Sequence, residues 1–584
     1  MPPSPLSNLQ TSAETVDKLT SLIEIGISLS AERDRNKLLS LILEHGKRLC
    51  HCDAATMYLV DDEDRLAFSL RTRGDPLPVS HLALHDPVTG APNERHLATW
   101  VALHPHSVVI DDAYDEPRFD LSGTHEMDRL SGYHTQSMLT VPMRSRAGTV
   151  VGVLQFLNAL DTDGQVVPFR HPLVQVAEAL AAQAAVAIEN HALLEGRAEL
   201  IDAIIQMIAG AIDARSPHTG EHCARVPTLA LMLAEAAGAS EEGVHANFRF
   251  RSQDAWREFR IGAWMHDCGK ITTPDHVLEK GAKLEMFYNR IHEVRMRFEI
   301  LRRDADIARL QSVIDGEDPA QADARFAETC TRLAEDFAFV AGMNLGAEST
   351  RPEDVERLRR IGDQAWTSHF DRRLGLTPAE HQRLGPDAAA PAGASRRERL
   401  LQDRPEHRIS HTPRDRELFA RGFRVDVPKY RLDHGEMHNL SVPSGTLTPE
   451  ERFLSRAHVM HTLSMLELIP FPDGLKRVPE YAGTHHESLT GNGYPRRMSA
   501  DELSVPARIM AIADIFEALT APDRPYRKAN SLSEAIELLA GFRDRGSIDP
   551  DLFALFLREG IHLRYAEQFL KPEQIDSVNI ARYV

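Results

Sequence analysis

The region that decides the fold of this chain is His485-His486-Glu487-Ser488-Leu489-Thr490-Gly491-Asn492-Gly493-Tyr494-Pro495. It sets two adjacent imidazoles and a carboxylate just before a glycine-rich turn that proline closes. Gly491 and Gly493 can take backbone conformations that other residues avoid, and Pro495 fixes the exit of the turn. A loop with only a structural role would not also need paired histidines, so the stretch predicts a functional site.

Two further clusters of the same character flank this one along the chain. They are Trp264-Met265-His266-Asp267-Cys268-Gly269-Lys270 and Ala513-Asp514-Ile515-Phe516-Glu517-Ala518-Leu519-Thr520. Together the three regions supply three histidines and two aspartates in apolar helical surroundings. Such mixed nitrogen and oxygen donors suit Mn, Fe, Ni or Zn better than Ca or Mg. The pattern indicates a hydrolase with several metal ions.

At these residues the sequence resembles the HD-GYP family, a subgroup of the HD metal-dependent phosphohydrolases known for hydrolysing cyclic di-GMP. The resemblance covers roughly residues 200–301 and 445–584. Residues 217–226 resemble the opening helix of the family, and residues 447–458 resemble the segment that ends in a further histidine ligand. The resemblance implies a ligand set of His222, His266, Asp267, His458, His485, His486 and Asp514.

Adjacent donors support two metal ions on physical grounds. His266 and Asp267 would project about 100° apart on a helix, so the pair can address two metals, with Asp267 as the bridging carboxylate. Two metals about 3.5–4 Å apart can activate a shared water and stabilise the attacking and leaving oxygens. We therefore expect two divalent transition metals, Fe or Mn first and Ni or Zn as alternatives. Lys270 resembles the family lysine at the scissile phosphate; the alternative is a solvated surface lysine. The expected catalytic residues are thus Asp267 and Lys270.

Three histidines leave alternatives open. His218 lies four residues before His222 and could hold a third metal, although some members of the family have a carboxylate there. His292 competes with His458 for one ligand position, but the spacing from the preceding leucine favours His458. We expect His461, one turn further on, to be a packing histidine or one that supports a metal ligand from behind.

The substrate should be anionic although the chain as a whole is acidic, and a small anion needs only a local pocket of positive charge. The chain's formal net charge of −19 argues against broad binding to DNA, RNA or anionic membranes. Local positive charge comes from Arg508, Arg524, Arg527 and Lys528, and residues 524–527 resemble the phosphate-contacting signature of the family. Arginine can bind two phosphate oxygens at once, while helix-end salt bridges are the alternative. We expect the substrate contacts to be Lys270, Arg508, Arg524, Arg527 and Tyr494.

Residues near 286–444 depart from the family pattern and are predicted to be an insertion. Phe287, Ile291, Val294, Phe298 and Leu301 recur at intervals of 4, 3, 4 and 3, which is typical of an amphipathic helix with a partner. A second helix is predicted near 320–341 and a flexible linker at 385–393. No catalytic motif is evident here, so a dimerisation or lid element is expected.

The N-terminal third has the pattern of a different domain. Short strands rich in β-branched residues are predicted at 55–60, 107–110, 137–142 and 150–158, each bounded by residues that favour turns. Their order resembles a GAF sensory domain over roughly residues 20–190. The Asn-Lys-Phe-Asp-Glu signature of cyclic-nucleotide-binding GAF domains is missing. The domain is therefore expected either to bind an unknown regulatory ligand or to serve dimerisation.

A long helix is expected to join the two domains. From Ala187 to Ile212 the apolar positions alternate by 4 and 3, which predicts the seam of a two-stranded coiled coil and a parallel homodimer. An ordinary helix packed on its own domain is the alternative. Five cysteines without a paired pattern, no signal peptide and no apolar run near 18 residues predict a reduced, cytoplasmic protein with no membrane partner.

The expected fold is thus a multidomain chain: an N-terminal α+β GAF domain with an antiparallel sheet, a long connecting helix, and an all-α HD-GYP domain with a mostly helical insertion. The predicted limits are a disordered 1–19, the GAF domain at 20–190, the signalling helix at 191–213 and the HD-GYP domain at 214–584. The implied function is a regulated phosphodiesterase that opens cyclic di-GMP to the linear dinucleotide, and on to GMP if a second hydrolysis follows. A catalytically weak sensing module and a hydrolase of another cyclic dinucleotide are the alternatives.

Overall fold

The computed structural model describes residues 20–32, 34–72, 80–215, 222–241, 245–346, 349–384, 395–521 and 529–584. The chain divides into two compact units, Met1–Ile201 and Asp202–Val584. The segment expected to be disordered, 1–19, and the linker expected at 385–393 lie outside the described residues.

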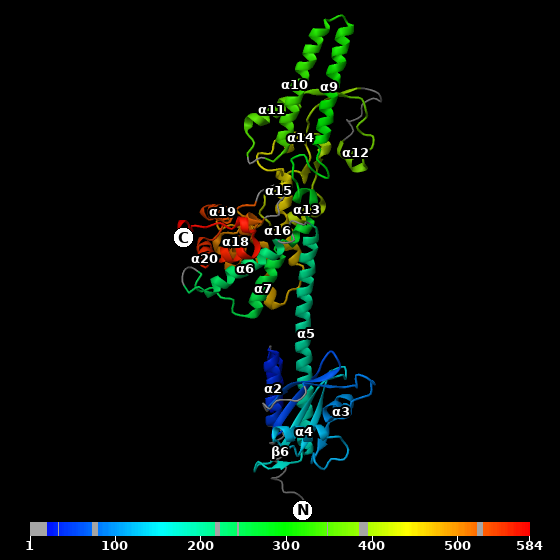
Figure 1. The fold of residues 1–584 in the computed structure, drawn as a ribbon, viewed down its shortest axis with the longest axis vertical. Helices are drawn as coiled ribbons and strands as arrows, with labels where there is room; N and C mark the ends of the chain where they lie inside the picture. The colour runs from blue at the N-terminus through cyan, green and yellow to red at the C-terminus, as the bar shows by residue number, and fades with distance from the viewer. Residues whose placement is uncertain are drawn as a thin grey trace, which may run out of the picture. The chain divides into compact units, whose positions relative to one another are not determined.

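The first unit is an α+β domain built on one antiparallel sheet (Figure 1). Its strands are β1 (Cys52–Val60), β2 (Arg65–Arg71), β3 (His81–Ala83), β4 (Val108–Ile110), β5 (Met138–Arg144), β6 (Val150–Leu160) and β7 (Val166–Val167). They follow the order β3-β2-β1-β6-β5-β4, and β7 pairs with β6. The four strands predicted from the sequence are β1, β4, β5 and β6.

Helices cover both faces of this sheet. They are α2 (Arg35–Leu49), α3 (Leu97–Leu103), α4 (Ser122–Ser131) and the start of α5 (His171–Arg215). Successive strand residues point to opposite faces, so Met57 joins the core under α2 and α5 whereas Tyr58 joins the core under α3. This alternation explains why the strands are apolar along nearly their whole length.

Helix α5 is longer than the sequence predicted. The apolar seam suggested a helix over residues 187–212, but the structure has one continuous helix from His171 to Arg215. Within it, His171–Ala211 is long and apolar enough to cross a membrane by length and composition. This corrects the expectation that no apolar run reaches such a length. Ala177, Leu180 and Ala184 are buried in the core of the first unit, which accounts for much of the apolar character.

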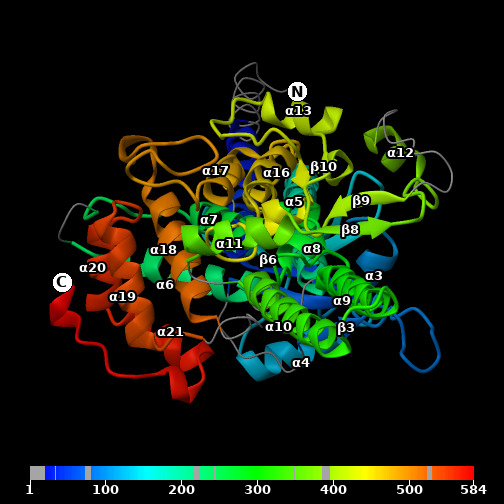
Figure 2. The same ribbon diagram turned by 90° about the horizontal axis from the view of Figure 1, so that it is seen from above.

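The second unit is mainly helical, and Figure 2 shows its helices from above. The helices that build the main core are α6 (His222–Ala239), α7 (Gln253–Met265), α17 (Val478–Gly483), α18 (Val505–Thr520), α19 (Leu532–Asp544), α20 (Pro550–Arg558) and α21 (Ile561–Phe569). Helix α16 (His458–Leu466) packs against α17. Shorter elements around them are η1 (Cys268–Thr272), α8 (Asp275–Leu278), α15 (Pro449–Arg456), η4 (Asp473–Leu475), η5 (Ala500–Glu502), η6 (Pro572–Gln574) and η7 (Ile580–Arg582). Phe259, Phe516, Phe553 and Phe556 are fully buried at the centre.

The insertion has a core of its own. Its elements are α9 (Ile291–Ile314), α10 (Pro319–Asn344), α11 (Pro352–Gly362), β8 (Ala365–Ser368), α12 (Pro378–Leu384), β9 (Arg396–Arg399), η3 (Pro405–His407), β10 (Arg408–Ile409), α13 (Pro413–Phe419), β11 (Leu432–Asp433) and α14 (Glu436–Leu440). Helices α9 and α10 lie side by side in both views (Figures 1 and 2). The helix predicted near 320–341 is α10.

The stripe predicted to need an outside partner is mostly buried inside the insertion. Ile291, Val294 and Phe298 pack in one cluster with Leu333 and Val340 of α10. Phe287 lies before the start of α9 and is 90% exposed, so it does not belong to the stripe. The partner of this helix is therefore α10, and the stripe gives no support to a dimer.

Buried lysines hold the two ends of the insertion together. The Lys280 Nζ donates to Glu451 at 2.8 Å and to Asn439 at 3.0 Å. The Lys283 Nζ donates to the carbonyls of Leu440 at 3.1 Å and Val442 at 3.0 Å. Because entry and exit meet at this point, the insertion can be long without separating the helices of the main core.

Candidate metal centre

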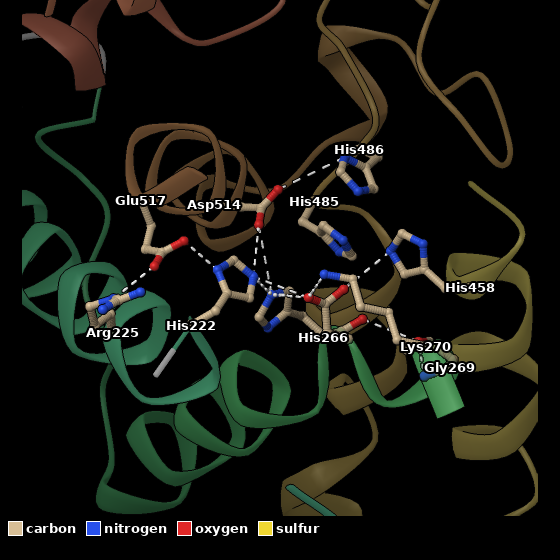
Figure 3. Close-up of polar contacts among 12 residues, drawn as sticks. His222, Arg225, His266, Gly269, Lys270, His458, His485, His486, Asp514 and Glu517 are labelled. Carbon is tan, nitrogen blue, oxygen red and sulfur yellow. Dashed lines mark hydrogen bonds and ion pairs between the residues drawn. The ribbon is translucent and has the colours of Figure 1, made fainter. Parts of the chain in front are cut away.

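Five helical segments far apart in the sequence bring polar side chains to one buried point (Figure 3). His222 is the first residue of α6, and His266 and Asp267 follow directly on α7. His458 is the first residue of α16, and His485 and His486 follow the end of α17. Asp514 lies within α18. All seven residues expected as ligands are therefore brought together.

These side chains form two triads joined by one carboxylate. Donor atoms of His222, His266 and Asp514 lie within 4.8 Å of one another, and those of His458, His485 and His486 do the same. The Asp267 Oδ2 is 3.0 Å from the Nε2 of His222 and 3.3 Å from that of His266. Its Oδ1 is 3.2 Å from the Nε2 of His458. The two oxygens of Asp267 thus face different triads, as a bridging ligand requires.

Backbone carbonyls orient three of the histidines. The Nδ1 atoms of His266, His458 and His485 lie 2.7, 2.6 and 2.8 Å from the carbonyl oxygens three residues earlier. A carbonyl only accepts, so each Nδ1 carries the proton and each Nε2 presents a lone pair to the cluster. The Nε2 atoms of His458 and His485 are buried and make no hydrogen bond. Buried lone pairs of this kind beside a carboxylate fit a metal ion.

The protonation states of His485, His486 and Asp267 match those of metal ligands. Burial lowers the pKa of His485 well below its usual value and that of His486 to about 3, so both rings are neutral. Burial opposes ionisation of Asp267, but Lys270 and the neighbouring histidines outweigh it and hold the pKa of the carboxyl well below its usual range. Metal ions bind neutral imidazole and ionised carboxylate.

His222 has a second carboxylate behind it that the sequence analysis did not single out. Its Nδ1 hydrogen-bonds to Glu517, whose other oxygen accepts from the Nε of Arg225 at 2.8 Å. Burial opposes protonation of His222, yet hydrogen bonds to Asp267, Asp514 and Glu517 raise its pKa well above the usual value. Glu517 lies three residues after Asp514 on α18, so helical spacing could have revealed it. It fixes the ring so that Nε2 faces the cluster.

Lys270 lies at the open side of the cluster. Its Nζ is 2.5 Å from the Asp267 Oδ2, and its side chain is 23% exposed. This position distinguishes it from a solvated surface lysine. A cation there can reach both the bridging carboxylate and an anionic ligand that approaches from solvent.

Gly269 permits the close approach of α16 to the segment that carries His266 and Asp267. A Cβ at this position would lie 1.9 Å from the carbonyl oxygen of His458. Thr462 accepts from the Gly269 N–H at 2.9 Å and donates to the His266 carbonyl at 3.1 Å. Direct backbone contact therefore sets the distance between the two triads.

The glycine-rich turn is fastened by Glu487. This carboxylate is 4% exposed and accepts from the N–H groups of Arg496 at 2.6 Å and Met498 at 2.9 Å. A Cβ on Gly493 would lie 2.5 Å from the Cα of Glu487, which explains the glycine. The turn sets the ring of Tyr494 against His486, with ring centroids 4.8 Å apart.

Other residues expected at the site lie elsewhere. The Arg508 guanidinium donates to Asp549 at 2.8 Å and to the carbonyls of Ala500 at 2.6 Å and Leu503 at 3.0 Å, so it is occupied in structural bonds. His292 lies on α9 beside Arg295 and far in the sequence from any cluster segment, which supports the choice of His458. His218, Arg524, Arg527 and Lys528 lie outside the described residues.

Comparison with known families and proteins assigns both domains. The HD domain family matches residues 398–552 and the GAF domain family matches residues 34–188. The chain is 28% identical over 301 residues to "3'3'-cGAMP-specific phosphodiesterase 3" of Vibrio cholerae, covering 51% of this chain and 62% of that protein. It is 34% identical over 114 residues to a cyclic di-GMP phosphodiesterase of Pseudomonas aeruginosa, covering 20% of this chain and 26% of that protein.

One further curated relative and one solved structure also match the chain. A cyclic di-GMP phosphodiesterase of Thermotoga maritima is 38% identical over 129 residues, which cover 21% of this chain and 34% of that protein. Among solved structures, the GAF domain/HD domain protein from Geobacter sulfurreducens is 19% identical with a TM-score of 0.22, covering 28% of this chain and 98% of that chain. The chain thus spans less than two thirds of the length of each of these curated relatives. It contains a GAF domain followed by a helical HD domain.

Proposed function

We propose that the protein is a metal-dependent phosphodiesterase that hydrolyses cyclic dinucleotides. The observation that carries this proposal is the pair of triads that share Asp267, with two buried Nε2 lone pairs that no hydrogen bond satisfies. The names of the similar proteins, which are cyclic di-GMP and 3'3'-cGAMP phosphodiesterases, support the substrate class.

The proposed centre holds two divalent ions. His222, His266 and Asp514 would hold one ion, His458, His485 and His486 the other, and Asp267 both. When bound, such a pair supplies an activated water and charge stabilisation for phosphoryl displacement. Mixed imidazole and carboxylate donors favour Fe or Mn, with Ni or Zn as alternatives.

The protein's own residues position the substrate and offset its charge. Lys270 stands at the open side of the centre, where its ammonium can donate to a phosphate oxygen as negative charge develops there. Glu517 and the backbone carbonyls behind the histidines keep the Nε2 atoms aimed inward. Burial of the cluster keeps bulk water away from the reacting phosphate.

We propose cyclic di-GMP as the substrate, opened to the linear dinucleotide, with GMP as the product of a second hydrolysis. A second candidate is 3'3'-cGAMP, because three of the similar proteins carry that name. A sensing module without activity is a third, and the complete ligand cluster disfavours it. Base selection depends on contacts outside the metal centre.

We propose further that the GAF domain binds a small regulatory ligand. A cavity of about 360 Å³ lies in this domain beside the sheet, with Tyr58, Phe68, His96 and Gln155 among its lining residues. Its volume falls in the range of small-molecule pockets. Helix α5 runs without a break from this domain into the second unit, so it could carry a signal if two states of the helix pack differently.

The experiment that tests the enzyme proposal is a product analysis. Purified protein is loaded with Mn²⁺ or Fe²⁺ and incubated with cyclic di-GMP, 3'3'-cGAMP and cyclic di-AMP, and the products are separated by chromatography. We expect metal-dependent conversion of one of the guanine-containing substrates to its linear form, abolished by chelation. Binding of these nucleotides without any turnover would favour the sensing module.

A further inference from the structure

A second pocket lies against the metal centre and is partly built by the insertion. It has a volume of about 340 Å³, in the range of small-molecule sites. Its walls come from three parts of the second unit: residues 424–428 of the insertion, helix α15 and the turn at 492–497. Segments more than sixty residues apart thus converge on one hollow.

The pocket borders the triad of His458, His485 and His486 through residues that lie next to these histidines. Tyr494 lines it and stacks on His486 with an interplanar angle of 25°. Arg456 also lines it, two residues before His458, with its guanidinium 5.3 Å from the centre of the Tyr494 ring. A ligand that reaches the metal centre from this side would therefore extend into the pocket.

Positive charge dominates the lining. Four arginines face the pocket, Arg424, Arg452, Arg456 and Arg497, against the single carboxylate of Asp426. Asp426 pairs with Arg497 at 2.7 Å. Within the part of the chain that the structure describes, the other three form no ion pair with a carboxylate. Four arginines against one carboxylate in the lining favour an anionic ligand.

Residues 424–428, which form the insertion's side of the pocket, are held in place by contacts with neighbouring segments. The backbone N–H of Arg424 donates to the carbonyl of Pro495 at 2.8 Å, which ties the insertion to the turn. The neighbouring Val425 packs on the cluster of Leu418, Phe453 and Met460. The base of the Arg424 side chain is thereby held at the pocket.

We propose that this arginine pocket binds the second phosphate of the cyclic dinucleotide, the one that is not cleaved, together with its attached sugar. The insertion is then a substrate-selecting element, because it supplies Arg424. This inference rests on the proposed function. A cyclic dinucleotide carries two phosphates in one small ring, so when one lies at the metals and Lys270, the other needs a cationic site close by. The metal centre alone would accept any accessible phosphodiester.

The test compares two substrates on the full-length, metal-loaded protein. One is the cyclic dinucleotide that the wild type hydrolyses, and the other is bis(para-nitrophenyl) phosphate, a diester with a single phosphate. The variants are Arg424→Gln and Arg452→Gln. Arg421→Gln is the matched control, because Arg421 is an exposed insertion residue outside the pocket lining.

We expect each pocket variant to raise KM for the cyclic dinucleotide about tenfold, the effect of losing one charge-assisted hydrogen bond. The kcat/KM for the cyclic dinucleotide relative to that for the small diester should fall by the same factor, and Arg421→Gln should leave this ratio unchanged. An unchanged ratio in both pocket variants overturns the inference, and so does an equal fall in Arg421→Gln. A wild type that cleaves the small diester but no cyclic dinucleotide overturns the proposed function instead.

Discussion

At the scale of single residues, Glu517 shows how a side chain that touches no substrate can control the metal centre. Its carboxylate holds the Nδ1 of His222 and is itself held by Arg225. We expect Glu517→Gln to weaken binding of the metal at His222 by about 10- to 100-fold, because partners behind metal-bound histidines have effects of this size. Metal titration followed by calorimetry measures the change.

The control for this variant is Glu559→Gln, because Glu559 is exposed at the end of α20. Both proteins should unfold cooperatively without metal. If Glu517→Gln bound metal as tightly as the wild type, Glu517 would be only a packing partner of Arg225.

Gly269 is a second position at which one added carbon atom would disturb the metal centre. In Gly269→Ala the new Cβ would lie 1.9 Å from the His458 carbonyl oxygen and 2.6 Å from the Thr462 nitrogen, and both are backbone atoms that cannot rotate away. We expect a loss of roughly 3 kcal/mol in the free energy of unfolding, at the upper end for overpacking. Urea denaturation measures it.

Gly238→Ala in α6 serves as the matched substitution, since a Cβ there meets nothing within 4 Å. It should stabilise the protein by about 0.5–1 kcal/mol, because alanine favours a helix over glycine. Equal effects of the two substitutions would contradict the close approach of α16.

At the scale of elements, two phenylalanines of the predicted apolar stripe have different environments in the insertion. Phe298 is 5% exposed and packs on α10, whereas Phe287 is 90% exposed. We expect Phe298→Ala to destabilise the protein by about 3–5 kcal/mol and Phe287→Ala to change stability by less than about 0.5 kcal/mol. Thermal unfolding of both variants measures these changes. If the stripe were instead a seam between two chains, both substitutions would destabilise the dimer, and neither would destabilise the monomer.

Helix α5 carries the remaining indication of a dimer. Leu193, Leu200 and Met207 recur every seven residues and are 66, 61 and 66% exposed, whereas Ile205 of the predicted seam is only 9% exposed. The exposed stripe therefore differs in part from the predicted one, of which Leu194 is also exposed, at 65%. We predict a homodimer through this stripe, and Leu200→Glu with Met207→Glu should give monomers in light scattering. A wild type that is monomeric at tens of micromolar would contradict the prediction.

At the scale of the whole molecule, the sequence was informative where chemistry restricts residue choice. All seven expected ligands meet, because motifs such as His266-Asp267 and His485-His486 have few other uses. Both domains were also foreseeable from their resemblance to known families, and the long helix from the periodicity of its apolar residues.

The features missed from the sequence depend on contacts between distant segments. Arg508 donates to Asp549, which lies 41 residues later in the chain, and the sequence near Arg508 does not predict that partner. The apolar stripe of α9 predicted a partner but could not distinguish α10 from a second chain. The arginine pocket joins residues 424–428 to the turn at 492–497, a proximity that only the folded insertion creates.

The central claim is that Asp267 bridges two metal ions, and elemental analysis with activity on the same samples tests it most directly. Asp267→Ala removes the carboxylate whose two oxygens lie within 3.5 Å of histidines from both triads. The account predicts two divalent ions per wild-type chain, and in the variant a lower metal content with turnover reduced by orders of magnitude. A variant that keeps two metals and near-normal turnover would contradict it.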